Sequence, residues 1–108
     1  MTSRRDQKMV RDRTPEVDAS VGLNLQYRVA ATHERLSWLE RKLVEEVGEY
    51  LQSGEVEELA DIMEVLFALG EEHETTVEEL DAVRRHKREQ RGGFDMGWIW
   101  YLEWEQRD

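Results

Sequence analysis

The sequence predicts an all-α protein organised around a helical hairpin, and three observations support this prediction. Apolar residues recur at helical spacing between residues 36 and 50, so they share one face of a helix. A second run, residues 56–69, is apolar over more than half of a helix circumference. A short break at Ser53-Gly54 separates the two runs. Such a break favours two antiparallel helices joined by a tight turn.

The ends of the two hairpin helices are predicted from the residues that flank them. Thr32 suits an N-cap, so the first helix is expected from there to about Gln52. Gly54 lies just past that end, where glycine commonly terminates a helix. The second helix is expected over about residues 55–71.

A third helix is predicted after the hairpin. Thr76 and Glu79 have the spacing of a capping box, which places its beginning at Thr76. The pair Gly92-Gly93 should end it. The fold is therefore expected to be a helical hairpin plus a third helix.

The segments outside these helices are less regular. Residues 1–7 are polar and are expected to be a flexible N-terminus, and residues 8–108 a single domain. Residues 8–15 are expected to form an ordered arm or loop, because Pro15 biases the residue before it towards extended geometry. Residues 16–25 carry turn signals and fit either a helix or a loop.

The C-terminal tail is rich in aromatic residues that favour strands. Residues 97–104 include three tryptophans, and the pattern allows a short two-stranded ribbon with Gln26–Ala30. The same aromatic residues suit a cover for the core, a contact between subunits, or a platform for stacking bases.

Composition limits the classes of function. The chain has 108 residues, no cysteine and a net charge of −10, so a thiolate metal site is excluded and binding to nucleic-acid polymers is disfavoured. The sequence has no apolar run of the roughly 20 residues that span a bilayer, so no membrane contact is expected and the location is expected to be cytoplasmic. The second helix is too apolar for three helices to cover, which predicts a homodimer or tetramer, an oligomeric helical bundle.

Two pairs of carboxylates mark the hairpin. Glu46 and Glu49 lie three residues apart on the first helix, and Glu58 and Asp61 repeat that spacing on the second. By helical geometry Glu46 lies at the edge of its apolar face, whereas Glu58 lies inside the apolar sector of the second helix. Four acids facing each other across the seam would repel unless cations lie between them. The alternative is a solvated acidic face, which is common on helices.

Charge is unevenly distributed along the chain. Residues 40–80 contain fourteen Asp or Glu and only two basic residues. Five basic residues then follow within eight positions: Arg84, Arg85, Lys87, Arg88 and Arg91. An acidic centre followed by a basic segment suits a metal and a polyanionic ligand. Basic residues near a helix C-terminus also interact favourably with the helix dipole without any ligand.

Several motifs together resemble one family. The segments KLVEEVGEY and EELADIMEV resemble the EExxE…ExxD signature of the all-α nucleotide pyrophosphohydrolases, the superfamily of MazG and phosphoribosyl-ATP pyrophosphohydrolase. The segments VRDRTPEV, LERKLVEEVGEYL, EELADIMEVLFAL and KREQRGGFDMGWIWYL are similar to the small single-domain phosphoribosyl-ATP pyrophosphohydrolase-like proteins. The resemblance extends from about Lys8 to Glu103. The interval from Glu49 to Glu58 is shorter than in many MazG proteins, so the hairpin is minimal.

The resemblance implies a magnesium-dependent enzyme, with Mn²⁺ as a substitute, that cleaves the α–β phosphate bond of a nucleotide to a monophosphate and pyrophosphate. It implies metal ligands at Glu46, Glu49, Glu58 and Asp61. It implies a catalytic role for Glu45 in orienting or deprotonating water, a place near the phosphates for Lys42, and phosphate contacts for Lys87, Arg88 and Arg91. A non-catalytic nucleotide-binding or protein-interaction module and an acidic dimer without a ligand are the alternatives.

Overall fold

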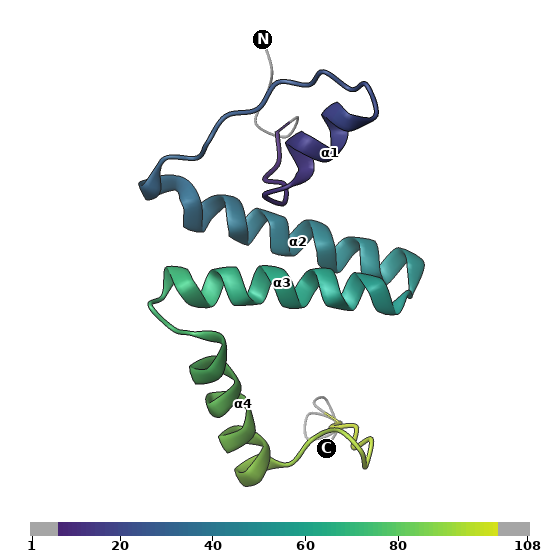
Figure 1. Ribbon diagram of the computed structural model, residues 1–108. Helices are drawn as coiled ribbons and strands as arrows, with labels where there is room; N and C mark the ends of the chain where they lie inside the picture. The colour runs from purple at the N-terminus through teal and green to yellow at the C-terminus, as the bar shows by residue number, and fades with distance from the viewer. Residues whose placement is uncertain (1–6, 102–108) are drawn as a thin grey trace. The chain divides into compact units, whose positions relative to one another are not determined.

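The computed structural model describes residues 7–101, and within this range the protein is helical with no strand (Figure 1). The all-α prediction is therefore confirmed for the described residues. The chain forms two compact units that divide between Val77 and Glu78. The elements are, in order, α1 (Thr14–Ser20), the 3₁₀ turn η2 (Thr32–Glu34), α2 (Arg35–Ser53), α3 (Val56–Glu72) and α4 (Val77–Arg91).

The predicted hairpin is formed by α2 and α3, which lie side by side along most of their length (Figure 1). Gly54 ends α2 in the left-handed region at φ 67°, and its N–H donates to the Tyr50 carbonyl at 2.7 Å. This conformation favours glycine because a side chain would crowd the following carbonyl. Glu55 then precedes α3 in extended geometry, so two residues suffice to reverse the chain.

The prediction that Thr32 caps the first long helix is wrong. Residues 32–34 form a 3₁₀ turn instead, and α2 begins at Arg35. The Glu34 carboxylate holds the chain in place where α2 begins. It accepts hydrogen bonds from the Ala31 N–H at 2.8 Å, Arg28 Nη1 at 2.5 Å and Trp38 Nε1 at 3.2 Å. An ionised acceptor with several donors outcompetes a neutral threonine hydroxyl for this role.

Glu34 should therefore make the stability of the wild-type protein depend on pH in a defined window, and replacing it should remove this dependence. The hydrogen bond from Arg28, then those from Ala31 N–H and Trp38, lower the pKa of Glu34 from 4.5 to about 2. A carboxyl whose pKa falls on folding stabilises the protein above its unfolded pKa, and this contribution is lost as the pH falls through the folded pKa. We expect Glu34→Gln to melt earlier than wild type at neutral pH.

The difference in melting temperature should shrink as the pH falls from about 4.5 towards about 2. Thermal melts across this range measure it, with Glu40→Gln, an exposed position on α2, as the control. A difference that stays constant with pH would contradict the prediction.

The N-terminal part of the chain is more helical than the sequence indicated. Pro15 lies in the first turn of α1, where the missing N–H would have had no helical partner. After α1 the chain turns at Gly22, which has φ 85°. Of the predicted arm, residues 8–15, the last two belong to α1. Residues 7–13 precede this helix without forming a helix or strand, and we call them the arm below. Most of the expected flexible segment 1–7 lies outside the described residues.

The two-stranded ribbon does not appear in the described part of the chain. Neither Gln26–Ala30 nor residues 97–101 form a strand, and residues 102–104 lie outside the described range. In the first segment Tyr27 donates to Asp18 Oδ2 at 2.5 Å, and Val29 is 90% exposed. The strand-favouring composition there lacks a partner strand, without which an extended segment is not stabilised.

The third helix is confirmed by α4, which begins directly after Thr76 and ends before Gly92. Gly92 has φ 81°, and its N–H donates to the Arg88 carbonyl at 2.8 Å, as expected for a glycine that terminates a helix. No helix within residues 7–101 combines the length and the apolar character needed to cross a bilayer.

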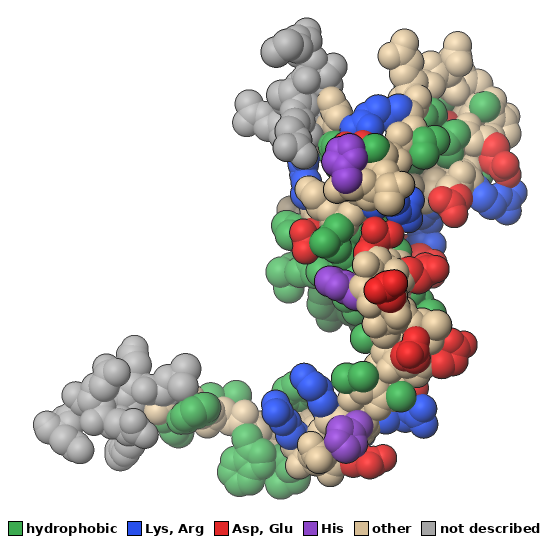
Figure 2. Space-filling model, turned by 90° about the vertical axis from the view of Figure 1, so that its left-hand side faces the viewer, with side chains coloured by type: hydrophobic (Ala, Val, Ile, Leu, Met, Phe, Trp, Pro, Cys, Tyr) green, Lys and Arg blue, Asp and Glu red, His purple; other side chains and the backbone are tan. Residues whose placement is uncertain are grey.

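The core of the described chain is small. Trp38, Leu39 and Val65 are its buried apolar residues, and Glu46 is buried with them. Many large apolar side chains remain exposed, and several are visible as green surface beside acidic groups in Figure 2. A carboxylate is thus among the most buried side chains of a protein that buries little else.

Candidate metal centre

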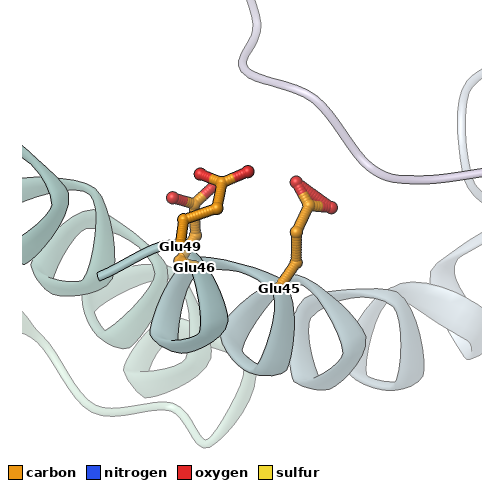
Figure 3. Close-up of side chains that lie close together, drawn as sticks. All are labelled: Glu45, Glu46 and Glu49. Atoms are coloured by element: carbon orange, nitrogen blue, oxygen red, sulfur yellow. The ribbon is translucent and has the colours of Figure 1, made fainter. Parts of the chain in front are cut away.

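The hairpin gathers six carboxylate and amine side chains that the sequence singled out. Three acids of α2, Glu45, Glu46 and Glu49, offer oxygens that all lie within 4.8 Å of one another. Figure 3 shows these three side chains projecting from one side of α2. Glu46 also forms a second such group with Glu58 and Asp61 of α3, within the same 4.8 Å limit. Glu46 is therefore shared by both groups and joins the two helices.

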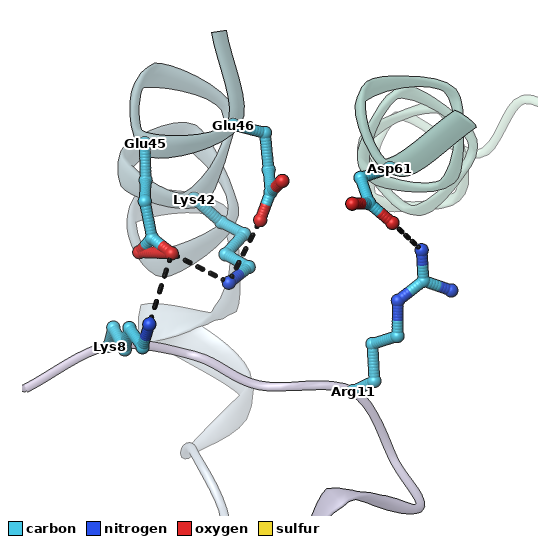
Figure 4. A network of polar contacts seen from close by, with 6 residues as sticks. All are labelled: Lys8, Arg11, Lys42, Glu45, Glu46 and Asp61. Carbon is cyan, nitrogen blue, oxygen red and sulfur yellow. Dashed lines mark hydrogen bonds and ion pairs between the residues drawn. The ribbon is translucent and has the colours of Figure 1, made fainter. Parts of the chain in front are cut away.

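The environment of Glu46 distinguishes this cluster from an ordinary acidic surface. The residue is only 6% exposed. Its Oε1 is paired with Lys42 Nζ at 3.2 Å, whereas Oε2 is buried without a hydrogen-bond partner among residues 7–101. An unpartnered buried carboxylate oxygen is costly. Glu46 and Asp61 point into the space between α2 and α3 (Figure 4), where a cation could satisfy them.

Lys42 is the positive charge closest to this cluster within the hairpin. Its Nζ lies 3.0 Å from Glu45 Oε1 and 3.2 Å from Glu46 Oε1, and its side chain is 15% exposed. Burial alone would lower the pKa of Lys42, but the hydrogen bonds and charges of Glu45 and Glu46 outweigh it and raise the pKa. Lys42 is thus held as a cation at one end of the cluster.

Glu45 has a different environment from its neighbour Glu46. It accepts hydrogen bonds from Lys42 Nζ at 3.0 Å and from Lys8 Nζ at 3.3 Å. Burial favours a higher pKa for Glu45, but Lys42 and then Lys8 lower it on balance. Glu45 is therefore an ionised acceptor with fixed orientation at the edge of the cluster.

Glu58 lies in a region of excess negative charge. Its pKa is raised, first by burial and then by the charges of Glu49, Asp61, Glu46 and Glu55. Within residues 7–101, Glu58 forms no ion pair with a lysine or arginine side chain. The second group thus holds more negative charge than its lysine and arginine neighbours neutralise.

Two cations at this site come from the arm, and the sequence analysis missed both. Arg11 Nη2 lies 2.5 Å from Asp61 Oδ1, and Lys8 Nζ pairs with Glu45 (Figure 4). These pairs join residues 50 and 37 positions apart in the chain. One signal in the sequence could have identified them. The acidic centre needs basic partners, and the segment that contains Lys8 and Arg11 supplies basic residues.

Arg11 should compete with a divalent cation for Asp61. We expect Arg11→Gln to strengthen Mg²⁺ binding by roughly two- to fivefold, because a partly exposed ion pair contributes up to about 1 kcal/mol. Titration calorimetry with Mg²⁺ alone measures the change. The control is Arg13→Gln, which removes the same charge from an arginine paired with Glu16. Weaker binding in the Arg11 variant would contradict competition.

The predicted phosphate-binding residues of the third helix are placed on α4. Lys87, Arg88 and Arg91 are exposed there, and Arg88 pairs with Asp95 at 3.6 Å. They belong to the second compact unit, which begins at Glu78. Their contact with phosphates stays a prediction.

The donor set of the two groups fits a hard divalent cation. All five acids offer carboxylate oxygens, which Mg²⁺ and Mn²⁺ prefer, and Glu46 adds a buried oxygen that lacks a partner within residues 7–101. Comparisons with protein-family models, with curated proteins and with solved structures found no match to this chain. The function is therefore inferred from the chemistry of these residues.

Proposed function

We propose that this protein is a magnesium-dependent nucleotide pyrophosphohydrolase, which cleaves the α–β phosphate bond of a nucleoside triphosphate or related nucleotide. The products are a nucleoside monophosphate and pyrophosphate. The observation that carries the proposal is the buried Glu46 carboxylate, which is shared by both acidic groups and has an oxygen without a partner in the described chain. Membership of the MazG and phosphoribosyl-ATP pyrophosphohydrolase superfamily is part of the same proposal.

The proposed roles follow from the positions of the side chains. Glu46 and Glu49 of α2 would hold the cation together with Glu58 and Asp61 of α3, which are the ligands the motif implies. A Mg²⁺ ion held by these carboxylates would supply activation of water and neutralisation of the charge that develops on the phosphates. Glu45, which is grouped with Glu46 and Glu49, would orient the attacking water by accepting a hydrogen bond from it.

Lys42 supplies the remaining fixed charge in this proposal. Its ammonium group is held at the cluster by Glu45 and Glu46. A cation fixed in this way can stabilise negative charge on a phosphate oxygen without reorganising during the reaction. The hairpin would thus contribute positioning and electrostatic stabilisation rather than covalent chemistry.

One observation favours a second candidate, a non-catalytic nucleotide-binding or protein-interaction module. Lys8, Arg11 and Lys42 already pair with three of the acids, so part of the cluster is neutralised by the protein's own cations. A cluster with internal counter-ions can serve as a structural junction. Turnover distinguishes the two candidates.

The test is an assay of pyrophosphate release from a panel of nucleotides, with and without Mg²⁺. The panel includes the standard ribo- and deoxyribonucleoside triphosphates and phosphoribosyl-ATP. Magnesium-dependent release that is absent from Glu46→Gln supports the enzyme. Nucleotide binding by calorimetry without release from any member would replace it with the non-catalytic module.

We also propose that the protein self-associates as a homodimer or tetramer. The outer surface of α3 carries a stripe of exposed apolar residues at helical spacing, and α2 carries another. Exposed apolar area on this scale is unusual for a monomer. The stripes are Val56, Leu59, Met63 and Leu66 on α3, and Val44, Val47 and Leu51 on α2.

Charging the α3 stripe should separate the subunits. Met63 is 52% exposed, so Met63→Glu places a charge on the stripe without entering the buried core of one chain. We expect sedimentation to give a lower mass for this variant than for wild type at equal concentration. Glu64→Gln, at the neighbouring exposed position, is the control. A wild-type protein that sediments as a monomer at high concentration would contradict self-association.

A further inference from the structure

A cavity of about 300 Å³ lies between the arm and α2, beside the carboxylates. Residues 7–9 of the arm line one side of it, and Trp38, Arg41, Lys42 and Glu45 of α2 line the other. All of these residues belong to the first unit. The cavity is at the small end of the range for ligand pockets, so it is large enough for one or two phosphoryl groups rather than for a whole nucleotide.

The charge of this cavity is opposite to that of the protein. Lys8, Arg41 and Lys42 line it with positive charge, and Glu45 is the carboxylate among its lining residues. The chain as a whole has a net charge of −10. A concave surface with several cations concentrates anions locally even where the net charge repels them.

The cations are held in place before any ligand arrives. The Arg41 guanidinium lies 4.7 Å from the centre of the Trp38 ring, which orients it through a cation–π contact. Trp38 is itself fixed by burial and by its hydrogen bond to Glu34. A cation that is already oriented loses less entropy when it binds an anion.

Lys42 and Glu45 belong both to the cavity wall and to the acidic cluster. An anion in the cavity would therefore lie next to a divalent cation held by the carboxylates. Phosphates bind through the combination of a divalent cation and fixed lysine or arginine side chains.

We propose that this cavity binds a phosphate group of the ligand, with Lys8 of the arm and Arg41 of α2 as its contacts. The arm is then part of the binding site and not only a cover for it. The identity of the ligand as a nucleotide rests on the proposed function, whereas the binding of phosphate by the cavity can be measured without turnover.

The test uses inorganic pyrophosphate as the probe, titrated into the full-length protein with Mg²⁺ present. Lys8→Gln and Arg41→Gln should each weaken pyrophosphate binding about tenfold, as expected for loss of one charge-assisted contact. Lys8→Arg should retain most of the affinity. Arg13→Gln, an exposed arginine of the arm that does not line the cavity, should bind as wild type.

The affinity for Mg²⁺, measured without phosphate, should not fall together with the affinity for pyrophosphate. Lys8→Gln removes a cation from Glu45, so Mg²⁺ affinity should stay equal or increase while pyrophosphate affinity falls. General unfolding would weaken both. Arg41→Gln removes the contact with the Trp38 ring and so can disturb the core. Lys8 is 60% exposed, so Lys8→Gln tests the inference without this complication.

The outcomes separate this inference from the proposed function. Pyrophosphate binding that is unchanged in the Lys8→Gln, Arg41→Gln double variant overturns the cavity assignment, even if the wild-type enzyme hydrolyses nucleotides. Loss of pyrophosphate binding in that double variant supports it, even if the wild type hydrolyses none. A wild-type protein that binds no pyrophosphate with Mg²⁺ overturns it directly.

Discussion

Glu46→Gln should abolish magnesium-dependent pyrophosphate release and weaken Mg²⁺ binding by at least about a hundredfold. Changes to groups that merely support a metal ligand cost up to about a hundredfold, and Glu46 contributes to both acidic groups. The substitution keeps the side chain's shape and removes its charge. Titration calorimetry and the pyrophosphate assay measure the two effects.

The same variant should be more stable than wild type when Mg²⁺ is absent. Glu46 buries a charge with one oxygen that has no partner in the described chain, while Lys42 retains Glu45 as its counter-ion. We expect the melting temperature of the metal-free variant to rise by several degrees, since 1 kcal/mol corresponds to about 4–8 °C in a domain of this size.

A matched control for Glu46 lies on the same helix. Glu40→Gln makes the same chemical change at an exposed position of α2 outside both acidic groups, so metal binding and activity should be unchanged. If Glu46→Gln instead melts much earlier than wild type and still binds Mg²⁺ normally, Glu46 is a structural ion-pair partner of Lys42.

Glu58→Gln is expected to have the second largest effect, with Mg²⁺ affinity and pyrophosphate release falling together. Glu58 is half-buried and is surrounded by the charges of Glu49, Asp61 and Glu46. Removing one of several mutually repelling charges should leave the metal-free protein at least as stable as wild type. The gain in melting temperature from added Mg²⁺ should be smaller than in wild type, since that gain depends on binding.

The control for Glu58 is its neighbour Glu57, which is exposed in the same first turn of α3. Glu57→Gln makes the same change near the helix N-terminus, so it corrects for the interaction of a negative charge with the helix dipole. Equal loss of activity in both variants would remove the specific role given to Glu58.

The sequence was sufficient to predict the hairpin because local signals determine it. The helical spacing of apolar residues predicted the two helices, and Gly54 predicted where the first of them ends. The sequence predicted that Glu58 would be more deeply buried than Glu46, and the structure shows the reverse. Glu46 seemed to lie at the edge of an apolar face and is buried, whereas Glu58, inside the apolar sector of α3, is only half-buried.

That difference has a physical reason. The apolar sector of α3 is wider than the surface that α2 covers, so lying within it does not ensure burial. Leu59 and Met63 of α3 are 41% and 52% exposed. Burial depends on the position of the partner helix, and helical periodicity alone does not specify that position.

The contribution of the arm could not be predicted for a related reason. Lys8 and Arg11 reach Glu45 and Asp61 from far along the chain. Charge patterns detect ion pairs within a helix, where partners are three or four residues apart. They give no information on which of several basic residues meets an acid in another element.

The two-residue connection between α2 and α3 has a consequence for tolerance to insertions. Exposed turns usually accept extra residues at little cost. Here Glu46 and Asp61 must meet across the hairpin, and Gly54 and Glu55 alone separate their helices. An inserted residue that lengthened α3 at its start would turn the following side chains by about 100° and carry Asp61 away from Glu46. The length of this exposed turn therefore determines whether the acidic group that joins the two helices can form.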